Sequence, residues 1–201
     1  AAVVSLFDVV ALRHIWRYSR AEFAIAATAL LGVLGSGPEN GVLIGAAISI
    51  ILLLRQTASP RVTELGRIPG TTRYGDVQRH PENERTPGVL VARCEASLLY
   101  FNVEHVRDRF TALIEERKAP IQLVVFFLGT VPRIDLAGAE LIAEMYTTLR
   151  ARGIELRLAE SNGFVRDALR RAGFERVYGT LADESVDGII SRYGPGHALI
   201  A

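Results

Sequence analysis

The sequence predicts an α/β fold, a mixed sheet with helices, preceded by an α-helical transmembrane hairpin. Residues 23–54 form an apolar run of 32 positions whose single ionisable side chain is Glu39, which is untypical of a soluble domain. After residue 87 the period changes, and short apolar strands alternate with amphipathic helices. We therefore divide the chain into the end of a transmembrane region (1–54), a linker (55–86) and a cytoplasmic α/β domain (87–201).

Composition excludes several classes of protein. Hydrophobic residues make up 49% of the chain, which excludes intrinsic disorder. Cys94 is the only cysteine, which excludes a disulfide scaffold. The net charge of +1 argues against general binding to nucleic acid, so we expect no nucleic-acid partner.

The start of the chain indicates a piece of a longer protein. It begins Ala-Ala-Val-Val, and the only methionine is Met145. Residues 1–12 are apolar but too few to span about 30 Å of hydrocarbon, so we expect the tail of a helix that began upstream. The arginines and aromatic residues of 13–20 favour a cytoplasmic loop at the headgroup level.

The apolar run is split by Gly-Ser-Gly-Pro-Glu-Asn-Gly at 35–41, which a continuous helix does not favour. The arms 23–34 and 42–54 are each short for a full span. Because arginines lie on both sides of the run, we predict a hairpin with 35–41 near its tip. One long helix kinked at Pro38 is the alternative. Glu39 is a functional intramembrane acid or, as we favour, a solvated or helix-capping residue.

Residues 55–86 are polar, rich in proline and glycine, and show no sustained period. They predict an ordered but irregular connector.

The last part of the chain predicts alternating strands and helices. Residues 121–128 are apolar without alternation, as expected for a central strand covered on both faces. The expected elements, in chain order, are strands at 88–96 and 98–102, a helix at 103–114 with Asn102 as its N-cap, a strand at 121–128, a loop at 129–135, a helix closed by Gly153, a strand at 154–159, a helix capped by Ser161 or Asn162 and ended by Gly173, a short edge strand at 176–179 and a helix at 183–193.

Motifs for metal or covalent chemistry are missing from this sequence. It holds no paired histidines, no Cys-x-x-Cys, no Gly-x-Ser-x-Gly and no phosphate loop. We interpret Cys94 as an apolar filler of a strand, His105 as part of a solvated charged face, and the arginines of 166–171 as a solvated stripe. We expect no metal, no cofactor and no enzymatic activity.

The most informative segment is the turn Val-Pro-Arg-Ile-Asp-Leu-Ala-Gly at 131–138, which joins a buried strand to an amphipathic helix. Asp135 lies at the start of that helix, where a carboxylate is favoured. A strand followed by Pro-x-Ile-Asp-x-x-Gly and a helix resembles the STAS domain, found in anti-sigma-factor antagonists and at the C-termini of SulP anion permeases. Residues 87–102 resemble the first strand pair of a transporter STAS domain. The linker and the apolar segments resemble the SulP elements that precede it.

The resemblance implies where a site would lie. The candidates in the STAS loop are Asp135, Leu136, Ala137 and Gly138. Phosphoregulated STAS domains carry Ser or Thr directly after the aspartate, whereas Leu136 and Ala137 follow here, so a phosphate switch is not supported. The resemblance also implies that the anion lies between two half-helices encoded upstream of residue 1.

The resemblance further implies function. It predicts the C-terminal fragment of a secondary active transporter for sulfate, bicarbonate or a dicarboxylate-type anion. Such a protein lies in the lipid bilayer of the cell (inner) membrane, with the STAS domain in the cytoplasm as a regulatory or interaction module. A homodimer and a protein partner of the STAS domain are expected. The alternative is a membrane-anchored STAS interaction module that transports nothing, and a soluble enzyme is disfavoured.

Overall fold

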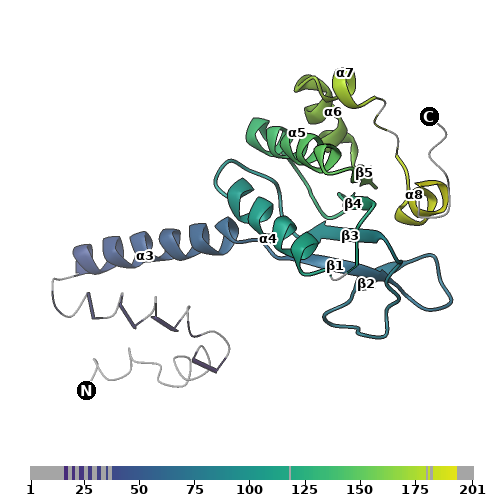
Figure 1. Cartoon of the computed structure of the whole chain (residues 1–201). Coiled ribbons are helices and arrows are strands. Elements are labelled where there is room, and N and C mark those ends of the chain that lie inside the picture. Colours follow the sequence, from purple (N-terminus) through teal and green to yellow (C-terminus); the bar gives the residue numbers. More distant parts are fainter. Residues whose placement is uncertain are drawn as a thin grey trace. The chain divides into compact units, whose positions relative to one another are not determined.

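The structure is a computed structural model that describes residues 16–17, 20, 23–24, 27–28, 31–32, 35, 38–117, 119–179, 181 and 183–193. The chain divides into two compact units, Ala1–Thr57 and Ala58–Ala201 (Figure 1). Each is described by itself below.

The first unit contains helix α3, Pro38–Ala58. The helix begins inside the segment 35–41 that we predicted as a hairpin tip, because proline has no N–H to lose in a first turn and Glu39 there favours the helix dipole. A Cβ atom on Gly32 would lie 3.2 Å from the Cα of Gly41, so these glycines allow close backbone packing.

No helix in the part of the chain that the structure describes is both long and apolar enough to cross a membrane. The predicted transmembrane hairpin is therefore not confirmed. Half of the residues in its first arm (23–34) lie outside the described residues, and so does the expected helix tail at 1–12.

The second unit is built on a five-stranded mixed sheet in the order β2-β1-β3-β4-β5. Strands β1 and β2 and strands β1 and β3 pair antiparallel, whereas β3, β4 and β5 are parallel. The strands are β1 Val62–Arg67, β2 Tyr74–Asp76, β3 Val89–Cys94, β4 Leu123–Phe127 and β5 Glu155–Ala159. The mixed α/β fold predicted from the sequence is confirmed.

Helices cover both faces of this sheet (Figure 1). On one face, the core side chains of β3 and β4, such as Leu90 and Phe126, pack against α4, α5 and α6. On the other face, Val125 of β4 packs against Val186 and Ile189 of α8. The helices are α4 Val103–Glu115, α5 Leu136–Ala151, α6 Gly163–Arg171, α7 Phe174–Tyr178 and α8 Val186–Tyr193. Strand β4 is buried on both faces, as its unbroken apolar run predicts.

The expectation of an irregular connector over 55–86 is wrong for its middle part, which contributes β1 and β2. Strand β1 has only two large apolar side chains, Val62 and Leu65, so the alternation was too short to identify. Strand β1 is stabilised by its antiparallel pairing with β3. The carboxylate of Glu64 in this strand is neutralised by Arg85 at 3.1 Å and by Arg117.

Two expected strands are also wrong. Residues 98–102 contribute only an isolated bridge between Leu98 and Ile134, because the backbone of Leu98 bonds to the turn before α5. Residues 176–179 fall largely in α7, in which Phe174 and Tyr178 pack against the core. Of the two caps left open for α6, the structure selects Asn162, whose side chain accepts from the N–H of Val165 at 3.0 Å.

Candidate functional site at the start of α5

The turn between β4 and α5 is held by hydrogen bonds to the end of β3 and to the start of α6. Thr130 donates its hydroxyl to the carbonyl of Cys94 at the end of β3, 2.8 Å away. Asn162 at the start of α6 donates its amide to the carbonyl of Val131, also at 2.8 Å. Val131 is fully buried. The turn therefore lies where the carboxyl ends of the three parallel strands meet, and its backbone is fixed.

Asp135 connects this turn to the loop before α4. One carboxylate oxygen, Oδ1, accepts from the N–H of Gly138 at 2.9 Å, which caps α5. The other, Oδ2, accepts from the N–H of Tyr100 at 2.9 Å. The N–H of Asp135 donates to the carbonyl of Leu98 at 3.1 Å. These partners give Asp135 a structural role, since both oxygens already accept hydrogen bonds.

Gly138 allows the loop before α4 to approach α5. A Cβ atom at this position would lie 2.6 Å from the carbonyl oxygen of Leu98 and 2.9 Å from its Cβ. The last glycine of the Pro-x-Ile-Asp-x-x-Gly pattern is therefore needed for packing. In the same pattern, Ile134 is buried and forms the bridge with Leu98.

The turn and the loops that follow β3 and β5 expose large apolar side chains, and the turn also exposes Arg133. The side chain of Leu136 is 66% exposed, and Tyr100 and Phe164, which follow the ends of β3 and β5, are 76% and 77% exposed. Ala137 is half-buried. The four predicted site residues thus divide into two that hold the turn, Asp135 and Gly138, and two that line its surface.

Sequence reasoning missed the partners of this turn. Leu98 and Tyr100 lie in a segment that we expected to be a strand. Asn102 begins α4, but its side chain makes no capping hydrogen bond. It accepts instead from the N–H of Leu99 at 2.9 Å and donates to the carbonyl of Ser97 at 3.0 Å, which folds the loop back. Asn102 is 1% exposed. This burial would have indicated its role in the loop, but it cannot be read from the sequence.

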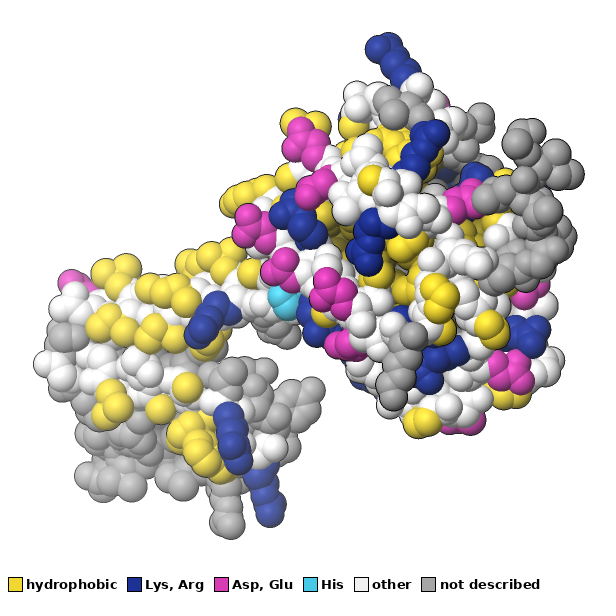
Figure 2. All heavy atoms as spheres, in the orientation of Figure 1, with side chains coloured by type: hydrophobic (Ala, Val, Ile, Leu, Met, Phe, Trp, Pro, Cys, Tyr) yellow, Lys and Arg dark blue, Asp and Glu magenta, His cyan; other side chains and the backbone are white. Residues whose placement is uncertain are grey.

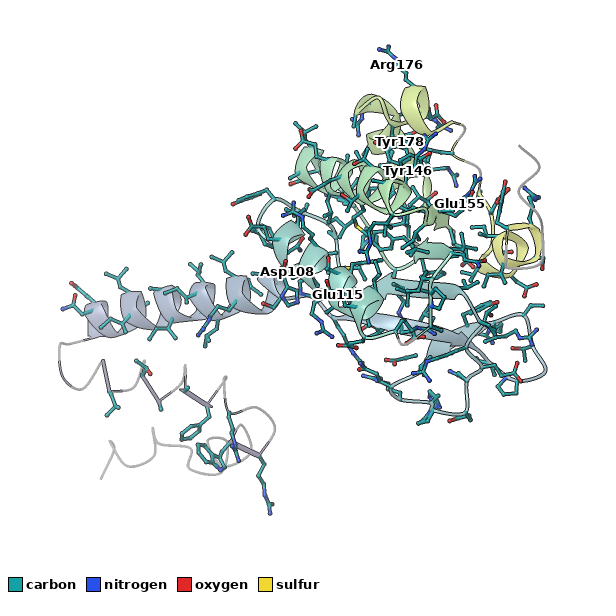
Figure 3. The ribbon with its side chains drawn as sticks, viewed as in Figure 1. Asp108, Glu115, Tyr146, Glu155, Arg176 and Tyr178 are labelled. Atoms are coloured by element: carbon teal, nitrogen blue, oxygen red, sulfur yellow. The ribbon has the colours of Figure 1, made fainter. Side chains whose placement is uncertain are left out.

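The other candidate groups are engaged in packing. Cys94 is fully buried, and burial raises the pKa of its thiol to about 11, which makes it a poor nucleophile. His105 is not on a solvated face as expected: it is half-buried and a ring nitrogen lies 3.2 Å from the carbonyl of Pro60. Asp108 and Glu115 of α4 are exposed (Figure 3). Within the described residues, no group of three or more His, Cys, Asp or Glu side chains could hold a metal ion.

Two of the three arginines of α6 form ion pairs with nearby carboxylates. Arg166 lies 3.1 Å from Asp183, and Arg170 pairs with Asp167 at 3.2 Å and with Glu175 at 3.1 Å. The hydrogen bond and the charge of Glu175 raise the pKa of Arg170. Arg171 donates to the backbone carbonyl of Asp167 at 3.3 Å. The stripe thus consists largely of surface ion pairs, which weakens it as an anion-binding patch.

Comparison with known proteins covers both units. Residues 80–187 match the family model of the STAS domain. High affinity sulfate transporter 2 of Stylosanthes hamata is 29% identical over 209 residues, an alignment that covers 97% of this chain and 31% of that protein. Sulfate transporter 1.3 of Arabidopsis thaliana is 32% identical over 200 residues, covering 92% of this chain and 30% of that protein. The chain thus spans about a third of the length of these relatives.

A solved structure has the same fold. The murine solute carrier 26 family member A9 anion transporter, in an inward-facing state, superposes with a TM-score of 0.78 at 20% sequence identity. The match covers 89% of this chain and 30% of that chain.

Proposed function

The chain belongs to the STAS domain family, and from this premise we propose that it is the C-terminal part of a secondary active anion transporter. Its relatives over most of the chain are named sulfate transporters. Sulfate is the first candidate substrate, and bicarbonate and dicarboxylates are the others that we predicted. The transported anion binds to residues upstream of this chain.

One observation carries the proposal. The STAS model matches residues 80–187, whereas the alignment to a sulfate transporter covers 97% of the chain. The likeness therefore includes the apolar segments before the STAS domain, which a free-standing interaction module does not need.

The surface of α3 supports the same proposal. Large apolar side chains are exposed on more than one side of this helix (Figure 2), among them Val42, Leu43, Ile50, Ile51, Leu53 and Leu54. A helix that is apolar all round requires cover by lipid or by other protein segments. We propose that α3 packs among the last helices of a transmembrane domain in the cell membrane and that the unit after it lies in the cytoplasm.

The role of the STAS domain in this proposal is to bind protein. The surface formed by Leu136 and Ala137 has no hydroxyl to phosphorylate and is partly exposed. We propose that this surface contacts a protein partner or a second subunit of a homodimer. Deleting residues 58–201 should then lower the amount or the rate of the transporter more than it changes the choice of anion.

The test is transport by the full-length protein in vesicles. Labelled sulfate, bicarbonate and dicarboxylate are offered outside, with ion gradients or a counter-anion inside and without ATP. We expect uptake of at least one anion that stops when the gradient is dissipated. Uptake that is independent of any gradient, or no uptake above that of empty vesicles for every anion, would contradict the proposal. In the latter case, a membrane-anchored interaction module is the better description.

A further inference from the structure

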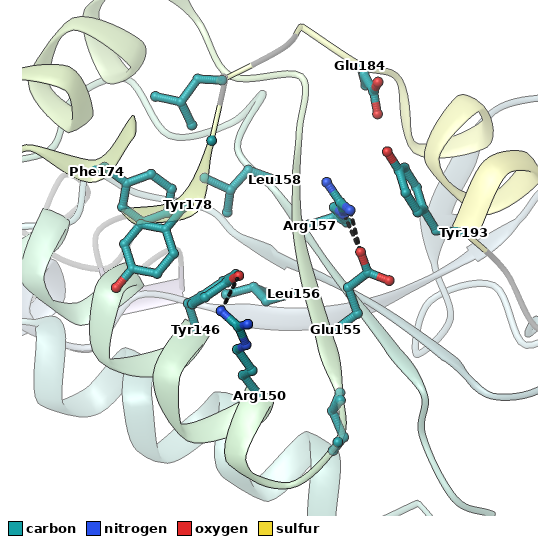
Figure 4. Close-up of a pocket in the computed structure, with 14 residues that line it drawn as sticks. Tyr146, Arg150, Glu155, Leu156, Arg157, Leu158, Phe174, Tyr178, Glu184 and Tyr193 are labelled. Carbon is teal, nitrogen blue, oxygen red and sulfur yellow. Dashed lines mark hydrogen bonds and ion pairs between the residues drawn. The ribbon is translucent and has the colours of Figure 1, made fainter. Parts of the chain in front are cut away.

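A cavity of about 560 Å³ lies along the outer edge of β5, the last strand of the sheet (Figure 4). It is bordered by the C-terminal half of α5, by α7 and by Tyr193 at the end of α8. Its size is within the range of about 300 to 1,000 Å³ that is typical of ligand sites. It lies at the opposite end of α5 from the turn described above.

The backbone of β5 has one edge that faces this cavity. Glu155 donates its N–H to the carbonyl of Gln122 at 2.9 Å, and the carbonyl of Ala159 accepts from the N–H of Leu128 at 2.8 Å. In a parallel ladder, alternate residues direct their backbone groups to the same neighbour. Leu156 and Leu158 therefore direct theirs away from β4. Both residues line the cavity, and among the described residues none donates to or accepts from these outward groups. Directly after β5, the N–H of Glu160 donates to the carbonyl of Glu184 at 2.9 Å, so the chain itself closes this edge beyond Leu158.

The two sides of the cavity differ in chemistry. On the α5 side, the rings of Tyr146 and Phe174 each lie 4.1 Å, centroid to centroid, from the ring of Tyr178. On the α8 side, the guanidinium of Arg157 lies 3.9 Å from the centre of the Tyr193 ring and pairs with Glu155. Side chains of an added strand would alternate between these sides, so apolar residues would alternate with polar ones.

Arg150 supplies a positive charge near the start of β5. Its guanidinium lies beside Tyr146, whose hydroxyl is 3.5 Å from Nη1 and whose ring centre is 5.9 Å from Cζ. Figure 4 shows the two side chains pointing toward one another at the cavity. A carboxylate at one end of a bound segment would complement this charge.

We propose that this cavity binds an extended peptide of a protein partner, which adds to β5 as a further strand. Unpaired strand edges are templates for such addition, in which main-chain hydrogen bonds give affinity and alternate side-chain pockets give specificity. The peptide has alternating apolar and polar side chains and an acidic residue facing Arg150. Residues of α7 and α8 border the cavity on its two sides, and we therefore assign it to a single strand rather than to the sheet of a second copy. The proposal does not depend on the transport activity proposed above.

The experiment uses the full chain of 201 residues and the probe acetyl-Glu-Val-Thr-Val-Thr-Val-amide. Two control probes carry N-methyl groups on alternate amides, one along each edge of the peptide. We expect saturable shifts of the Leu156 and Leu158 amide signals in nuclear magnetic resonance. Only one of the two methylated probes should lose binding, because a single edge of the peptide meets β5. Equal binding of all three probes, or no binding of any, would overturn the proposal.

Variants of the protein make the test independent of the probe's side chains. Leu158→Pro removes an outward N–H from β5, whereas Leu158→Ala removes most of the side chain and keeps that N–H. We expect Leu158→Pro to bind the probe about tenfold more weakly than Leu158→Ala. Arg150→Gln should weaken the glutamate probe but not its glutamine counterpart. Slow hydrogen exchange of the Leu156 and Leu158 amides without any peptide would show that the chain covers its own edge, and would also overturn the proposal.

Discussion

Asp135 is the residue on which the turn before α5 depends most. Its two carboxylate oxygens accept from Gly138 on one side and from Tyr100 on the other, so a single side chain joins two segments 35 positions apart in sequence. This arrangement explains why an aspartate stands at this position although no hydroxyl follows it. The residue stabilises the local fold through these two hydrogen bonds.

We expect Asp135→Ala to lower the free energy of unfolding by about 2 kcal/mol, because both the cap and the link to Tyr100 are lost. Asp135→Asn keeps one oxygen and should lose less. Chemical denaturation measures both. The matched control is Leu136→Ala at the adjacent exposed position. If Leu136→Ala lowered the free energy of unfolding as much as Asp135→Ala, the structural role of Asp135 would be refuted.

Gly138 is predicted to tolerate no side chain. Gly138→Ala places a methyl group 2.6 Å from the carbonyl oxygen of Leu98, and we expect a loss of about 1–3 kcal/mol from overpacking. The control is Gly163→Ala in α6, where nothing lies within 4 Å of the added Cβ atom. Gly138→Ala should melt at a clearly lower temperature than Gly163→Ala. Equal melting temperatures would show that the loop around Leu98 can move to make room for the methyl group.

The buried thiol of Cys94 gives a prediction for pH. Its pKa is raised from 9.0 to about 11 by burial, so the folded state favours the neutral thiol. The resulting stabilisation is complete below pH 9 and is lost as the pH rises toward 11. The stability of the wild type should therefore fall faster over this window than that of Cys94→Ala. Parallel curves for the two proteins would contradict the assignment.

Strand β1 shows how an element of weak pattern is held in a sheet. Five of its six residues are buried, including Thr63 and Glu64. The carboxylate of Glu64 pairs with Arg117 and Arg85, and Arg117 also donates to the carbonyl of Val89 at 3.2 Å. The ion pair of Glu64 with Arg117 thus connects β1 to the end of α4, and the hydrogen bond of Arg117 to Val89 extends this link to β3.

At the scale of this element, we expect Glu64→Ala to destabilise the domain by about 2 kcal/mol, since Arg117 would remain largely buried without its partner. Glu84→Ala, which removes the partner of Arg67 on the surface, serves as the control and should change little. Urea unfolding monitored by circular dichroism compares the two. An equal effect would mean that the buried pair contributes no more than the exposed one.

At the scale of the molecule, the boundary of the folded unit decides which fragment can be studied. The compact unit begins at Ala58, whereas the change of pattern in the sequence suggests residue 87. A fragment that starts at 87 lacks β1 and β2, and the edge of β3 that pairs with β1 would be exposed.

We therefore expect residues 58–201 to unfold in one cooperative transition, and residues 87–201 to melt at a lower temperature or to aggregate. Differential scanning calorimetry of both fragments measures this. Equal melting temperatures would show that β1 and β2 are accessory. The same comparison tests whether the segment 55–86, apart from its first residues, belongs to the domain rather than to a linker.

The sequence by itself determined the alternation of strands and helices after residue 87, because apolar periodicity is a local property that survives without knowledge of neighbours. It located β3, β4 and β5, the helices α4, α5, α6 and α8, and the turn at 131–138. It also located the apolar segment that contains α3. In these parts, runs of Leu, Val and Ile predict which residues are buried.

Only the tertiary structure decided what depends on partners distant in the chain. It assigned β1 and β2 to the sheet, turned residues 176–178 into helix, and paired the loop at 98–100 with Asp135 and Gly138. Polar strands, buried asparagines and backbone pairings carry no periodic signal, since their stability comes from hydrogen bonds and ion pairs that form only after the chain has folded. The position of β5 at the outer edge of the sheet was also decided by the tertiary structure, because an edge is defined by which strands lie beside it.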